Sequence, residues 1–132
     1  EFHVDGTLPD PMEWIWVFGS NEAGRHGLGA ARVALKNFGA KRGVGFGLQG
    51  RSYAIPTKDE NLHSLAIYLI EQHVFRFLGF AANNLQMKFF VTRVGCGLAG
   101  YADAQMAPLF RLAPQNCSFA NRWAPYLTDT PL

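Results

Sequence analysis

Apolar runs that end at glycine-rich turns constrain this sequence more than any other feature. The first run, Trp14 to Phe18, is continuously apolar, rich in aromatic and β-branched residues, and ends at Gly19, which favours a buried strand. Residues 30–38 then carry small and apolar side chains at helical spacing, and Gly39 follows as a helix stop. A strand, a glycine-rich turn and a helix in this order are typical of an α/β protein.

The same alternation continues along the chain, so we expect a mixed, mostly parallel sheet flanked by helices. The sequence Thr57-Lys58-Asp59-Glu60 has the T-x-x-E form of a capping box and is predicted to start a long apolar helix. The glycine-rich stretch 43–50 is not expected to form a good strand or helix by itself. The further expected elements are strands at 52–56, 88–95 and within the tail after 114, and helices at 62–78 and 103–110.

Composition indicates one globular domain. The chain has 132 residues, of which 48% are apolar and 17% are charged, and we expect a single domain over 1–132 with peripheral segments at 1–13 and 124–132. The net charge of +2 and the absence of a block of Lys or Arg argue against duplex nucleic-acid binding.

Cys96 and Cys117 lack metal-ligand spacing, so no metal site is expected, while a disulfide between them stays open. Without a secretory segment or an apolar run of 18 residues, the sequence predicts a cytoplasmic protein with reduced thiols and no membrane partner.

Two glycine-rich loops, 19–29 and 95–100, follow expected strands. Because ligands bind at the carboxyl ends of strands in α/β sheets, we expect both loops to meet there and bind phosphate through backbone N–H groups. Gly19 and Gly24 have the G-x-x-x-x-G spacing of a P-loop. However, Arg25 stands in place of the P-loop Lys, and His26 stands in place of its Ser or Thr. The dinucleotide pattern G-x-G-x-x-G is absent too, so neither regular nucleotide fingerprint is present.

Ser20-Asn21 followed by RHGLGAA at 25–31 resembles the first ligand loop of macro domains. VGCGLAG at 94–100 is similar to that family's second, phosphate-binding loop, and the resemblance covers about residues 14–123. It implies a macro-like fold that binds ADP-ribose or a related nucleotide or NAD metabolite, and some members of the family hydrolyse ADP-ribose linkages. The aspartate that contacts adenine in that family has no convincing counterpart here, and Asp5 is a weak candidate.

The candidate ligand-binding residues belong to the two loops and their neighbours. Arg25 is a candidate phosphate partner because a guanidinium binds phosphate bidentately, and Arg93 is either a second such partner or one half of an ion pair on a sheet face. Tyr101 either stacks on a sugar or base or packs in the core, and Gln49 either reaches the ligand or shapes a turn. The full set is Ser20, Arg25, Gly27, Gly29, Gln49, Gly95, Cys96, Gly97, Leu98, Ala99, Gly100 and Tyr101.

Three residues are candidates for catalysis. Asn21 is either a turn residue or, by the resemblance, a contact to a ribose hydroxyl. His26 is a candidate general base, since an unperturbed histidine has a pKa of about 6.5, and equally a donor to phosphate. Asp103 has two alternative interpretations: the preferred one is a helix cap, and the other is a catalytic acid. The remaining histidines, His3, His63 and His73, are expected to be structural or solvated.

Three functional hypotheses follow. The first is a metal-independent hydrolase of ADP-ribose linkages, in which the loops hold a diphosphate. The second is a non-catalytic module that senses or sequesters a nucleotide metabolite and needs no cofactor. The third is a structural protein that forms homo-oligomers through the apolar helix at 62–78.

Overall fold

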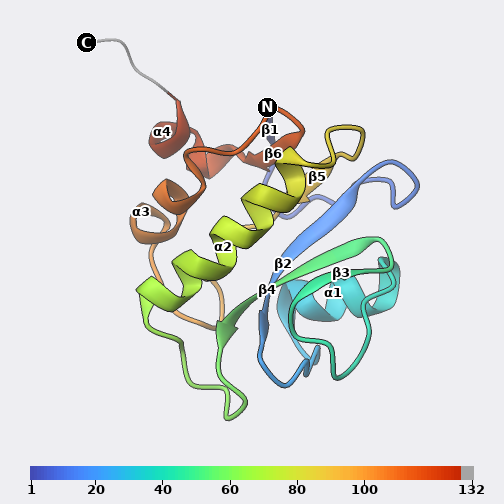
Figure 1. Ribbon diagram of the computed structural model, residues 1–132, viewed down its shortest axis with the longest axis vertical. Helices are drawn as coiled ribbons and strands as arrows, with labels where there is room; N and C mark the ends of the chain where they lie inside the picture. Colours follow the sequence, from blue (N-terminus) through green and yellow to red (C-terminus); the bar gives the residue numbers. More distant parts are fainter. Residues whose placement is uncertain (129–132) are drawn as a thin grey trace.

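Six strands form one sheet in the order β1-β6-β5-β2-β4-β3 in the computed structural model, which describes residues 1–128 (Figure 1). Neighbouring strands are parallel except at one edge, where β3 pairs antiparallel with β4. The expected single-domain α/β fold with a mostly parallel sheet is therefore confirmed. The strands are β1 (Phe2–His3), β2 (Ile15–Asn21), β3 (Gly47–Gln49), β4 (Ser52–Lys58), β5 (Phe89–Val91) and β6 (Cys117–Ala120).

Helices cover the two faces of the sheet unequally. Figure 1 shows α2 crossing in front of the strands and α1 lying behind them. The helical elements are α1 (Gly29–Asn37), α2 (Ile67–Ala82), α3 (Asp103–Met106), α4 (Ala124–Leu127), and the 3-10 turns η1 (Ala107–Phe110) and η2 (Asn121–Trp123). No helix within residues 1–128 is long and apolar enough to cross a bilayer.

The hydrophobic core is divided by the sheet into a large and a small part. The α2 side holds nineteen buried residues, among them the fully buried rings of Phe77, Phe110 and Trp123. The α1 side holds eight, centred on Trp16 and Phe18, where alanines of α1 let this short helix lie close to the strands. The α1 side of the sheet is thus only partly covered, and this leaves room for a cavity.

The long helix begins at Ile67 and not at residue 62, so the predicted capping box was wrong. Thr57 is the penultimate residue of β4, and its carbonyl accepts the Leu65 N–H at 2.9 Å. Asp59 instead closes a turn, with its carboxylate accepting the N–H groups of Asn61 and His63 at 2.8 and 2.9 Å. The same T-x-x-E pattern serves a strand end and a turn because the chain folds back onto β4 before the helix starts.

Both expected peripheral segments, 1–13 and 124–132, contain secondary structure. Residues 1–13 contribute β1, which joins the sheet beside β6. The end of the chain forms α4, and the last part of the expected segment 124–132, residues 129–132, lies outside the described residues. Cys96 and Cys117 are both free thiols, so no disulfide joins them.

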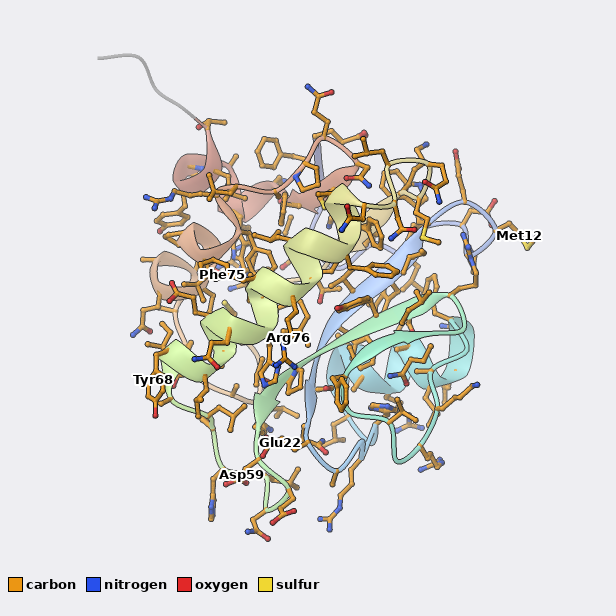
Figure 2. The ribbon with its side chains drawn as sticks, viewed as in Figure 1. Met12, Glu22, Asp59, Tyr68, Phe75 and Arg76 are labelled. Atoms are coloured by element: carbon orange, nitrogen blue, oxygen red, sulfur yellow. The ribbon has the colours of Figure 1, made fainter. Side chains whose placement is uncertain are left out.

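The outer surface of α2 carries exposed aromatic rings. Figure 2 shows Tyr68 and Phe75 on this helix, and they are 63% and 51% exposed. These rings are compatible with the assembly hypothesis, which stays a prediction.

Phe77→Ala is expected to lower the free energy of unfolding by about 3–5 kcal/mol, because it empties a fully buried site between α2 and the sheet. Phe75→Ala on the same helix is the control, with an expected change of about 0.5 kcal/mol because the ring is half exposed. Urea denaturation measures both. Equal losses for the two variants would contradict the described orientation of α2.

Candidate functional site

One cavity of about 600 Å³ opens at the carboxyl ends of the parallel strands, on the α1 side of the sheet. Both glycine-rich loops line it, and His3 and residues 5–8 of the N-terminal segment form a further wall. The expected meeting of the two loops at one sheet edge is therefore what the structure has. The cavity contains these sequence-predicted residues: Ser20, Asn21, Arg25, Gly27, Gly29, Gly95, Cys96, Gly97, Leu98 and Ala99.

Unpaired backbone N–H groups reach this cavity from two sides. In the second loop, the amides of Gly97, Leu98 and Ala99 donate to no acceptor among the described residues. On the opposite side, α1 starts without a side-chain cap or an acidic residue in its first turn. The first helical N–H groups have no partner within a helix, and they carry partial positive charge. The two sides together form an anion-binding environment.

Asn21 holds the first loop in shape. Its Nδ2 donates to the Arg25 carbonyl at 2.9 Å, and its Oδ1 accepts the Arg25 N–H at 3.0 Å. The neighbouring Ser20 hydroxyl donates to the Gly45 carbonyl. Both side chains lie in the cavity wall, but the polar atoms of Asn21 are already bound to the loop backbone. The structure thus gives Asn21 a role in loop geometry, in place of the predicted catalytic one.

The loop also needs glycine at one close contact. Gly24 has φ +69°, and a Cβ there would overlap the backbone nitrogen of Val44. This contact packs the first loop against the segment before β3, and the Gly43 N–H donates to the Gly24 carbonyl at 3.0 Å.

His26 does not reach the cavity, so its predicted role as a general base there is not supported. Its ring is fully buried beneath the first loop and meets Phe18 edge to face at 5.3 Å. Nε2 lies 3.0 Å from the Val44 carbonyl oxygen, which makes it the donor, and Nδ1 has no partner among the described residues. His26 therefore supports the loop from inside.

Asp103 is outside the cavity and is bound to Arg93, which lines it. The Arg93 Nε and Nη2 donate to the two carboxylate oxygens at 2.8 and 2.9 Å, and Trp123 Nε1 donates at 2.8 Å. These bonds, chiefly those from Arg93, lower the pKa of Asp103 to about 2. A carboxyl group that stays ionised at neutral pH cannot supply a proton, so the predicted catalytic acid is a structural ion-pair partner.

Three other predicted ligand-binding residues lie away from the cavity. Gln49 is buried, with Oε1 accepting the Lys41 N–H at 2.7 Å and Nε2 donating to the Val44 carbonyl at 2.9 Å. The Tyr101 hydroxyl donates to the Leu65 carbonyl at 2.6 Å. Gly100 is not part of the lining. Gln49 and Tyr101 thus stabilise the backbone of neighbouring loops. This agrees with the structural alternatives given for them from the sequence, a turn for Gln49 and a packed ring for Tyr101.

The sequence did not reveal an aromatic floor, formed by His3, Phe90 and Trp16. The His3 ring stacks on Phe90 with centroids 3.6 Å apart, and Phe90 stacks on Trp16 at 5.6 Å. Burial lowers the pKa of His3 to about 4, so the imidazole is neutral near pH 7. Its Nδ1 lies 2.8 Å from the Ser118 hydroxyl, 115 residues away in the chain. Pattern alone contains no signal for so distant a contact.

Lys58 is a further residue of the cavity that the sequence did not reveal. It is the last residue of the buried strand β4 and lines the cavity, as Arg25 does from the first loop. Neither cation takes part in an ion pair within residues 1–128. Their charge adds to that of the free N–H groups.

Cys96 lines the cavity as a neutral thiol, because burial raises its pKa to about 12. No group of three or more His, Cys, Asp or Glu side chains in the described part of the chain is arranged to hold a metal ion.

Comparisons with protein-family models, curated proteins and solved structures find no match for this chain. The functional interpretation therefore rests on the chemistry of the cavity.

His3→Gln is expected to flatten the pH dependence of stability between about pH 6.5 and 4. The unfolded chain binds a proton at His3 below about pH 6.5, whereas the folded chain does so only near 4. The stability contributed by neutral His3 is complete above pH 6.5 and is lost as the pH falls towards 4. Urea denaturation at pH 7.0 and 4.5 measures this loss, with His63→Gln as an exposed control. An unchanged pH slope in His3→Gln would contradict the half-buried, neutral imidazole.

Proposed function

We propose that this protein binds ADP-ribose or a related nucleoside diphosphate in the cavity and does not cleave it. One observation carries the proposal: two sets of backbone N–H groups without acceptors border the same cavity. One set belongs to Gly97–Ala99, and the other belongs to the start of α1. Backbone amides at a helix start and in a glycine-rich loop suit phosphate oxygens. Two sets that border the same cavity suit the two phosphates of a diphosphate.

The other part of the ligand is proposed to be a nucleoside. In the aromatic floor, Phe90 is stacked between His3 and Trp16 and is 6% exposed, so the half-buried His3 ring is the part that a base or a sugar would contact. Leu28 and Val33 on the α1 side and Leu8 on the N-terminal side add apolar contacts. A cavity of about 600 Å³ is within the range of about 300–1,000 Å³ typical of small-molecule sites.

The titratable groups of the cavity favour binding over hydrolysis. Cleavage of a glycosidic linkage generally uses a proton donor and a base placed at the bond. Asp5 is engaged with Arg93 at 3.4 Å, the His3 pKa is near 4, and the Cys96 pKa is near 12. His3 and Cys96 are therefore not suited to exchange a proton near pH 7, and the Asp5 carboxylate is paired with the Arg93 guanidinium.

Lys58→Gln is expected to weaken ADP-ribose binding about tenfold, because a hydrogen bond to a charged group contributes about 1.5–3 kcal/mol. Isothermal titration calorimetry measures this, and Lys36→Gln on the exposed surface of α1 is the control. ADP-ribose is expected to be recovered intact, and adenosine, which lacks phosphate, is expected to bind much more weakly.

Two results would overturn the proposal. Equal affinity for adenosine and ADP-ribose would exclude the phosphate contacts. Release of ADP-ribose from an ADP-ribosylated peptide, lost in a cavity variant such as Lys58→Gln, would show that the site is catalytic.

A further inference from the structure

The charges of this chain are strongly segregated. Residues 23–58 carry seven Lys or Arg and no Asp or Glu, whereas the rest of the chain carries five cations and ten anions. The net charge of +2 hides this division, because the two parts nearly cancel. The cationic segment contains the first loop, α1, β3 and β4, which include one wall of the cavity.

Two of these cations border a second hollow next to the cavity. It measures about 200 Å³ and lies between the first loop and the segment before β3, with Arg25 and Arg42 in its lining. Arg25 and Gly27 line both the hollow and the main cavity, so the two are adjacent around Arg25. Neither arginine takes part in an ion pair within residues 1–128. A negatively charged group leaving the cavity past Arg25 would meet Arg42 next.

The hollow also has an unmet hydrogen-bonding group in its wall. His26 is fully buried there, and with Nε2 bound to the Val44 carbonyl its Nδ1 is an acceptor without a partner in the described chain. Buried polar atoms are rarely left unpaired. The protein covers Nδ1 in this structure, so the two guanidinium groups of Arg25 and Arg42 are the groups that the hollow offers to a ligand, and a guanidinium binds phosphate oxygens bidentately.

An exposed aromatic ring lies close by in sequence. Phe46, three residues after Gly43 of the hollow, is 64% exposed and stacks on no other ring among the described residues. Cations that follow a backbone, together with aromatic rings on which bases stack, are the usual means of binding single-stranded nucleic acid. An acidic peptide would use the cations but not the ring.

We propose that the hollow is a second phosphate subsite and that the ligand is the end of a single-stranded nucleic acid. This rests on the proposed function: the terminal nucleotide lies in the main cavity, and the next phosphate of the strand passes Arg25 to reach Arg42. The seven cations of residues 23–58, of which Arg25 and Arg42 border the hollow, then add electrostatic attraction for the rest of the strand.

The test compares a 5′-phosphorylated single-stranded octaadenylate with ADP-ribose. Fluorescence anisotropy gives the affinity for the labelled octamer, and calorimetry gives that for ADP-ribose. Arg42→Gln is expected to lower the ratio of octamer affinity to ADP-ribose affinity about tenfold, and to reduce the slope of log affinity against log salt by about one. Arg111→Gln, an exposed arginine at the end of η1, is the matched control and is expected to leave both quantities unchanged.

Failure of this proposal and failure of the proposed function are distinguishable. An unchanged ratio in Arg42→Gln would overturn the second subsite while ADP-ribose binding stands. Displacement of the octamer by polyglutamate at equal charge concentration would overturn the choice of nucleic acid. If the octamer binds with the expected dependence on Arg42 and ADP-ribose does not bind, the subsite is supported and the proposed ligand is wrong.

Discussion

The wall of the cavity depends on the paired charges around Arg93. This arginine follows β5, binds both carboxylate oxygens of Asp103 at the start of α3, and reaches Asp5 of the N-terminal segment at 3.4 Å. Trp123 donates to the same Asp103 carboxylate, which ties the C-terminal part of the chain to this point. Charge-assisted, bidentate hydrogen bonds of this kind are among the stronger ones in proteins. The second glycine loop starts two residues after this fixed point, so Arg93 anchors the loop that lines the cavity.

The incomplete cover of the α1 side of the sheet creates the space that these groups border. A nine-residue helix and the segment 3–8 leave a gap between them, and His3, Phe90 and Trp16 form its floor. The polar side chains nearest the loops are already bound to backbone atoms, as Asn21 and Gln49 are. What the cavity offers to a ligand is therefore backbone N–H groups, two free cations and apolar side chains such as Leu8, Leu28 and Val33. This set favours holding a phosphorylated ligand over transforming it.

The sequence predicts those features that depend on neighbouring residues. The apolar runs predicted the strands β2 and β5, and the glycine-rich loops predicted two walls of the cavity. The residues misjudged, His26 and Asp103, have chemistry set by Val44 and Arg93, which the fold brings to them. His3 joins the floor through a strand of two residues and a contact to Ser118, and neither has a local pattern. The capping box failed because T-x-x-E is compatible with a turn as well as with a helix start.

The central claim is that backbone N–H groups from two loops hold the phosphates of one ligand. Amide chemical shifts in a ¹⁵N–¹H correlation spectrum, followed during titration with ADP-ribose, test it directly. The account predicts that the largest shifts fall on Gly97–Ala99 and Gly29–Ala31, with little change at Tyr68 and Phe75 on the outer surface of α2. Shifts that gather on α2, or no shifts at saturating ADP-ribose, would contradict it.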